Sequence, residues 1–280
     1  MTASPFRLMF AVALATALSA AACDIKVDDG RLSLGVSRGR ASDEWTRTYP
    51  ISKGGRLEIL NQNGSITAEG TTGSQVEIKA VREATGSSDE AARARLEGLK
   101  MREEIMPDHI VVEVERAGGS IGFGDRGLTI RYEVKVPAGL NVRLRTANGA
   151  VRLEHLDGRI VASTTNGQVA GTAAGAVEAS TVNGGVQLEL SAVRGDVRMT
   201  AVNGGIRLTV PADVSADLEA RTVNGRVSID DALRLEGSSG GERGTSLSGR
   251  IGKGGPRLSL QTTNGGVRIG VRGGPVNQGG

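Results

Sequence analysis

The dipeptide Asn-Gly recurs seven times along the chain, and its surroundings recur with it. The seven asparagines are Asn63, Asn148, Asn166, Asn183, Asn203, Asn224 and Asn264. From Asn148 onward they are spaced by 18, 17, 20, 21 and 40 residues. We expect the last interval to span two repeats, with one degenerate marker between them. An apolar residue stands three positions after each asparagine and another six positions before it, and a threonine stands two positions before most of them. Self-similarity at a nearly fixed period indicates a repeat architecture.

Apolar and polar residues alternate on both sides of each Asn-Gly, which is the pattern of a strand with one buried face. Two folds fit this pattern. Asn-Gly between alternating strands is a strong hairpin signal, so the repeats could form an antiparallel meander. A β-solenoid instead stacks equivalent positions of successive coils, which explains why the same residue type recurs at the same step. We therefore predict an all-β, right-handed parallel β-helix or β-solenoid with two strands per coil of about 20 residues.

The composition agrees with a narrow core. The chain of 280 residues holds 42 glycines but only six aromatic residues, and its apolar residues are mostly Val, Leu, Ile and Ala. Proteins that stack nucleic-acid bases need aromatic platforms, which this chain lacks. The formal net charge of +3 is also too small to indicate a nucleic-acid partner.

The N-terminus carries an export signal. Residues 1–22 have a positive residue, Arg7, then an apolar stretch too short to span a bilayer, then a run of small residues. This run immediately precedes Cys23, the only cysteine, and resembles a bacterial lipobox. The resemblance implies that Cys23 is lipidated and becomes the first residue of a membrane-anchored chain. The alternative is ordinary cleavage after Ala22, which leaves a soluble protein.

The rest of the chain divides by composition. The predicted boundaries are a tether at 23–44, a repeat domain at 45–270 and a disordered tail at 271–280. Within the repeat domain, residues 86–104 are predicted as the single inserted helix, with Ser88 as its N-cap. The Gly/Ser-rich stretch 236–256 is predicted as a loop.

Residues that carry chemistry are scarce. Residues 122–127 have the G-x-G-x-x-G spacing, but a strand pattern follows where a dinucleotide site needs a helix, so we expect a loop. His109 and His155 are the only histidines, and we predict no metal site, no cofactor and no catalytic residue. The pair Asp230-Asp231 ends a strand, where a turn role is expected.

Outward-facing arginines are the candidate ligand contacts. Arg152, Arg207 and Arg268 each stand four residues after an asparagine of the repeat. Stacked coils would align them in a column able to hold an anionic glycan or lipid headgroup through charge-assisted hydrogen bonds. The alternative is a solvated face that is polar for solubility.

Two segments carry a family resemblance. Residues 54–70 (GGRLEILNQNGSITAEG) and 136–167 (VPAGLNVRLRTANGAVRLEHLDGRIVASTTNG), together with the export signal, resemble the DUF4097 family of bacterial β-strand-repeat proteins. That family is related to the head-GIN adhesin domains. The resemblance covers about 45–270 and implies a parallel β-helix-like fold at the cell envelope, with no established enzymatic activity.

We expect, from these observations together, a non-enzymatic, exported and lipid-anchored envelope protein that acts as an adhesin-like binding or scaffold solenoid. It would lie on the periplasmic or cell-surface face, with the membrane reached through Cys23. One alternative is an envelope-stress sensor whose partner is a membrane signalling protein. Another is a glycan-active enzyme on the same fold, which needs clustered carboxylates.

Overall fold

The computed structural model describes residues 23–28, 31–36, 39–116, 119–120, 127–240 and 244–273. These residues form strands and one short helix, α1 (Asp89–Glu97). The predicted signal segment 1–22, residues 122–126 of the G-x-G-x-x-G segment, and residues 274–280 of the predicted tail lie outside the described residues.

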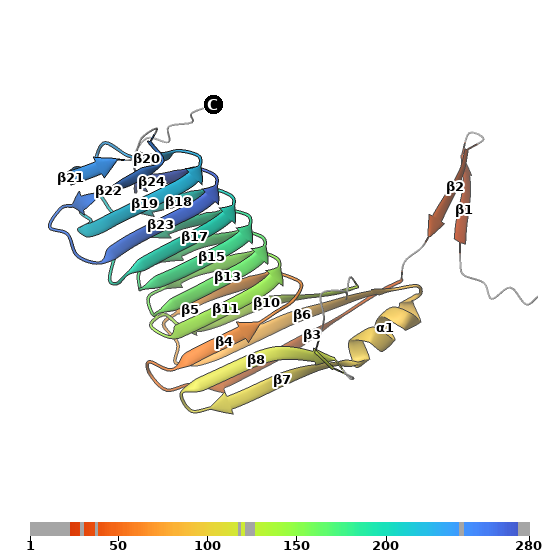
Figure 1. The fold of residues 1–280 in the computed structure, drawn as a ribbon. Coiled ribbons are helices and arrows are strands. Elements are labelled where there is room, and N and C mark those ends of the chain that lie inside the picture. Colours follow the sequence, from red (N-terminus) through yellow and green to blue (C-terminus); the bar gives the residue numbers. More distant parts are fainter. Residues whose placement is uncertain are drawn as a thin grey trace, which may run out of the picture.

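Two large sheets carry most of the strands and enclose one apolar core between them (Figure 1). The twelve-stranded sheet has the order β21 (Leu235–Gly240), β22 (Ser246–Ile251), β19 (Ala216–Asn224), β23 (Arg257–Asn264), β17 (Val197–Asn203), β15 (Val177–Asn183), β13 (Ile160–Asn166), β11 (Asn141–Asn148), β4 (Arg56–Leu60), β8 (His109–Arg116) and β7 (Leu99–Met106), with β9 (Gly119–Ser120) paired to β8. The ten-stranded sheet has the order β20 (Val227–Ile229), β24 (Val267–Val271), β18 (Ile206–Val210), β16 (Val186–Leu190), β14 (Val169–Ala173), β12 (Val151–Leu156), β5 (Ile66–Thr71), β10 (Leu128–Pro137), β6 (Gln75–Gly86) and β3 (Gly39–Pro50). A separate hairpin joins β1 (Cys23–Asp28) to β2 (Arg31–Val36).

Each Asn-Gly repeat places one strand in each large sheet, and equivalent residues of neighbouring repeats pair in parallel. Val142 lies opposite Ile160, and Ile160 lies opposite Val177. The parallel registers exclude the antiparallel meander for the repeats. The inward positions are aliphatic residues and alanines with almost no exposed surface, as the composition predicts.

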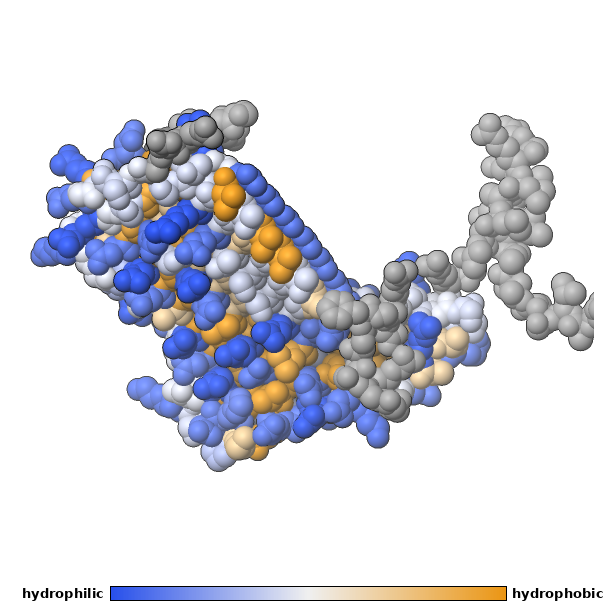
Figure 2. All heavy atoms as spheres, in the orientation of Figure 1, coloured by the Kyte–Doolittle hydropathy of each residue, from blue (hydrophilic) through white to orange (hydrophobic). Residues whose placement is uncertain are grey.

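The seven asparagines form a continuous ladder along one edge of the stack. In stack order they are Asn63, Asn148, Asn166, Asn183, Asn203, Asn264 and Asn224. Each side chain after the first donates from Nδ2 to the Oδ1 of its predecessor in this order, across 2.7–2.9 Å. Figure 2 shows a straight hydrophilic row along an edge of the stack. The recurrent asparagine is therefore a structural element that ties coil to coil.

The glycine after each asparagine is required by close stacking. Gly184 has φ +149°, and a Cβ there would lie 1.9 Å from the carbonyl oxygen of Gly167 in the next coil. The threonine two positions before the asparagine points inward and donates its hydroxyl to such a glycine carbonyl, as Thr164 does to Gly149 across 2.8 Å. The same bond is made by Thr146, Thr181, Thr222 and Thr262. Ala201 occupies this position in β17, so the Gly184 carbonyl lacks a threonine donor.

Chain order and stack order differ at both ends of the stack. Strand β4 lies between β8 and β11, and β23 lies between β17 and β19. Figure 1 shows β23, in darker blue, between the earlier strands β17 and β19. The last repeat of the sequence is thus enclosed by two earlier ones.

Antiparallel strands flank the parallel stack. At one end β6 pairs with β10, β3 with β6, and β7 with β8; at the other, β22 pairs with β19 and β21 with β22. The helix α1 packs against β3 and β6, away from the repeats, over a small second core that includes Leu96 and Leu128. Such flanking strands limit the exposed parallel edges that invite aggregation.

The structure corrects the predicted helix 86–104. Ser88 is the N-cap as predicted, accepting the Ala91 N–H, but the helix ends before Gly98. Residues 99–104 belong to β7, which pairs along its whole length with β8. The hydrogen bonds to β8 outweigh the helix propensity of this Lys-, Arg- and Glu-rich stretch.

Two predicted irregular segments also contain strands. The Gly/Ser-rich stretch 236–256 forms most of the β21–β22 hairpin, because β19 offers it a strand edge to pair with. The interval between Asn224 and Asn264 therefore does not hold a second coil, since both strands of this hairpin lie in the twelve-stranded sheet. The predicted tether 23–44 contains the β1–β2 hairpin and the start of β3, whose residues 39–44 pair with β6. At the predicted tail, Val271 is still the last residue of β24.

Candidate functional site

The outer face of the ten-stranded sheet carries the predicted arginine column. In stack order, the residues four positions after the asparagines are Thr67, Arg152, Ala170, Gln187, Arg207, Arg268 and Ser228. Arg207 and Arg268 lie directly opposite each other on β18 and β24, because the last repeat is enclosed there. Arg152 lies three coils away from Arg207. The structure therefore brings together two of the three predicted arginines.

Arg207 and Arg268 line a groove of about 400 Å³ on this face. The backbone of Gly185, Gly205 and Gly266 forms its floor, and Gln168 and Arg226 lie at its two ends. Gln187 and Ser228 extend the arginine column along its side. Arg226 was missed by the sequence analysis, because it stands two positions after its asparagine rather than four.

The three floor glycines are not demanded by the fold. Unlike five of the seven glycines that directly follow an asparagine, none of them has a positive φ. A Cβ at these positions would lie 3.1–3.3 Å from the nearest backbone oxygen, a tight but adjustable contact. Equivalent positions of other coils hold larger side chains, namely Ala150, Gln168 and Arg226. The hollow therefore results from three consecutive Asn-Gly-Gly coils in the stack.

The groove is positively charged and its arginines are unpaired. Within the described part of the chain, the side chains of Arg207, Arg226 and Arg268 have no ion pair and no hydrogen bond, and each of the three residues is exposed. Some arginines outside the groove do have partners: Arg272 lies 2.9 Å from Glu189, and Arg194 lies 3.5 Å from Asp157. Neighbouring strands are about 4.8 Å apart, so guanidinium groups that project from adjacent coils can bind one phosphate, sulfate or carboxylate group together.

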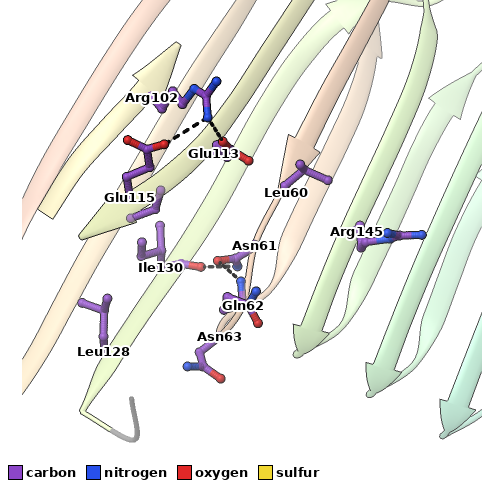
Figure 3. Close-up of a pocket in the computed structure, with 11 residues that line it drawn as sticks. Leu60, Asn61, Gln62, Asn63, Arg102, Glu113, Glu115, Leu128, Ile130 and Arg145 are labelled. Carbon is purple, nitrogen blue, oxygen red and sulfur yellow. Dashed lines mark hydrogen bonds and ion pairs between the residues drawn. The ribbon is translucent and has the colours of Figure 1, made fainter. Parts of the chain in front are cut away.

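A second pocket, of about 360 Å³, lies where β8 and β10 leave the regular stack (Figure 3). Three of its four charged side chains contact one another, since the Arg102 guanidinium lies 3.0 Å from each of the Glu113 and Glu115 carboxylates; the fourth, Arg145, points away from them. The Asn61 amide donates to the carbonyl oxygens of Ile130 and Gly64. Figure 3 shows Arg102 between the two carboxylates and Asn61 beside Ile130. These contacts hold this end of the stack together.

The two histidines, Asp230 and Cys23 lie in strands or beside turns. His109 begins β8, with Nε2 3.9 Å from the Glu58 carboxylate, and His155 lies at a bulge in β12 with φ +54°. Asp230 accepts the Ala232 N–H in a turn, as predicted. The described residues hold no group of three or more potential metal ligands, and none of their helices is long and apolar enough to cross a bilayer. Cys23 is the first residue of β1.

The sequence profile described as Toastrack DUF4097 matches residues 50–270. The chain belongs to the DUF4097 family. This confirms the resemblance carried by the repeat segments. The DUF4097 chain matches no curated protein.

Several solved structures are similar to this DUF4097 chain. One is a candidate cell adhesion protein from Clostridium sporogenes, 11% identical, with 83% of this chain and 100% of that chain covered and a TM-score of 0.47. Another is a candidate adhesin from Bacteroides fragilis, 10% identical, with 82% and 97% covered and a TM-score of 0.26. A third is a candidate lipid binding protein from Parabacteroides distasonis, 9% identical, with 81% and 96% covered and a TM-score of 0.29.

Proposed function

We propose that this protein is a non-enzymatic, adhesin-like binding protein of the bacterial cell envelope that holds an anionic polymer or headgroup in the Arg207–Arg268 groove. The observation that carries the proposal is the hollow of about 400 Å³ lined by three exposed arginines without partners. Clustered positive charges repel each other. An anion bound in the hollow relieves this repulsion and accepts charge-assisted hydrogen bonds, and both effects favour binding.

Export and lipid anchoring at Cys23 complete the proposal. The chain enters the ten-stranded sheet at β3, and the groove lies near the opposite end of that sheet. Seven strand spacings separate β3 from β18, which is about 34 Å. An N-terminal anchor would thus leave the groove well away from the chain's entry point and accessible to a glycan or a second surface. We also propose a right-handed winding of the coils, since crossovers between parallel strands of one sheet are nearly always right-handed.

The groove is tested by retention of the purified mature protein on two materials, anionic cell-wall polymer and vesicles that contain anionic lipid. We expect retention on one of them at low salt, and its loss in the double variant Arg207→Gln/Arg268→Gln. The single variants Arg207→Gln and Arg268→Gln are compared with Arg152→Gln, which likewise removes one charge from the same column, three coils from Arg207. Equal retention of the three single variants would refute the groove as the binding site.

The anchor is tested separately by membrane fractionation. Cys23→Ser should move the protein from the membrane fraction to the soluble fraction if Cys23 carries the lipid. An unchanged membrane fraction refutes lipidation and leaves the groove proposal intact. If neither polymer nor vesicle retains the protein, cross-linking to a membrane signalling protein would favour the sensor hypothesis instead.

A further inference from the structure

The asparagine ladder ends at Asn224, and this end differs chemically from the rest. Asn224 Nδ2 donates to Asn264 Oδ1, but no asparagine follows Asn224 in the stack to occupy its own Oδ1. Both Asn224 and Gly225 are exposed. The side-chain carbonyl of Asn224 therefore has no hydrogen-bond donor among the described residues.

The backbone of the Asn-Gly pairs shows the same difference. In six pairs the glycine N–H donates to the backbone carbonyl of the asparagine in the next coil, across 2.7–3.0 Å. These glycines are Gly64, Gly149, Gly167, Gly184, Gly204 and Gly265. Gly225 is the seventh, and its N–H has no such acceptor among the described residues.

We propose that Asn224 is a site of spontaneous deamidation, and that stacking suppresses the same reaction at the other Asn-Gly pairs. The Gly225 backbone nitrogen attacks Cγ of Asn224 and loses its proton; the side-chain amide leaves as ammonia, and a five-membered succinimide forms. Water then opens one of the two ring C–N bonds to give aspartate or isoaspartate. The net reaction consumes one water and releases one ammonia, with no oxidant or cofactor.

Stacking opposes this reaction for a geometric reason. The attacking nitrogen must be free of its hydrogen bond, and the asparagine side chain must rotate toward it. At an inner pair such as Asn203-Gly204, the glycine N–H is held by Asn264 and the side-chain amide is held on both sides. Both must open before the nitrogen can attack. At Asn224 the side-chain bond to Asn264 and the bond from the Gly265 N–H to the Asn224 backbone carbonyl have to open, but the attacking Gly225 N–H has no acceptor to leave among the described residues. Gly225 also has the backbone freedom that ring closure needs.

The experiment measures deamidation at each site in the full chain. The purified protein is incubated at mildly alkaline pH, digested with trypsin, and the gain of one mass unit is followed by mass spectrometry. Trypsin places Asn224 in the peptide 222–226, Asn203 in 199–207 and Asn264 in 258–268. The same measurement in denaturant gives the rate of each pair without stacking.

We expect the native Asn224 peptide to react faster than the native Asn203 and Asn264 peptides. Those two should be slowed at least about tenfold against their denatured rates, which corresponds to about 1.4 kcal/mol of local opening. Asn224→Gln should remove the early signal, and the rate of the Asn203 peptide, whose side-chain bonds to Asn183 and Asn264 are untouched, should stay as slow as before. Equal native rates at Asn224 and Asn203 would overturn the proposal. So would suppression of Asn224 to the rate of Asn264.

Discussion

Asn264 donates a side-chain hydrogen bond to Asn203 Oδ1 across 2.8 Å, although 61 residues separate them in the sequence. On its other side Asn264 accepts from Asn224, which precedes it by 40 residues. The last repeat of the chain therefore lies second from the end of the stack. Because strands β19 and β20 pair with β23 and β24 rather than with their own predecessors, this end of the fold forms only after the whole chain is available.

The missing threonine at position 201 predicts a stabilising substitution. Thr181 and Thr262 flank Ala201 in register on either side, so the site has the geometry that accepts threonine elsewhere in the stack. Ala201→Thr should donate its hydroxyl to the Gly184 carbonyl and raise the free energy of unfolding by about 1 kcal/mol. Denaturant unfolding at constant m-value measures it. Thr262→Ala is the reciprocal control and should destabilise by at least as much; a destabilised Ala201→Thr would show that the lumen has no room.

The inward column predicts a severe substitution at Val186. This side chain is 1% exposed, and aspartate there would place an unpaired charge in the narrow core. We expect Val186→Asp to cost at least about 3 kcal/mol, visible as a large fall in melting temperature. Gln187→Asp, on the exposed neighbouring residue, should change stability by less than about 0.5 kcal/mol. Comparable melting of both variants would contradict the assigned faces.

The glycine floor of the groove predicts a variant that loses binding without losing stability. Gly205→Gln introduces the residue that Gln168 already provides at the equivalent position, so the fold should tolerate it. The new side chain fills the hollow between Gly185 and Gly266, and retention on the anionic material should fall together with that of the arginine variants. Ala150→Gln makes the same kind of change outside the groove and should bind normally; loss of binding in both would point to a general effect of the added side chain.

The buried Tyr132 hydroxyl predicts an effect that depends on pH. It has no hydrogen-bond partner among the described residues, so Tyr132→Phe should stabilise the protein by about 1 kcal/mol at neutral pH. Burial raises the pKa of Tyr132, so the folded state keeps the proton after the unfolded state has released it near its ordinary pKa of about 10. The wild type should therefore lose stability as the pH rises above that value, and the advantage of Tyr132→Phe should widen. Melting curves at neutral and alkaline pH compare the two; an advantage that shrinks with pH would refute this account.

The sequence was sufficient to predict the stacked coils because their signal is local and repeated. Val186 and its equivalents recur at one step of every repeat, and so do the asparagines. The order of the coils is not local: residues 216–229 and 257–271 carry the same pattern, so nothing in either repeat says which one lies at the end. The groove follows from that order, since Arg268 reaches Arg207 only when the last repeat is enclosed. Likewise, residues 99–104 have helix-forming side chains, and only pairing with β8 makes them a strand.

The exchange of coil order at both ends constrains how such a protein can change in length. A new repeat added after the last one would have to separate β23 from β19, and one added at the beginning would have to separate β4 from β8. Repeats between β11 and β16 follow one another in chain order and are joined by short turns. Duplicating or deleting one of these repeats would shift the following coils by one strand spacing, about 4.8 Å, and leave the parallel strand pairing and the asparagine hydrogen bonds intact. Proteins of this fold should therefore differ in the number of middle repeats, while the strand order at the two ends of the stack stays the same.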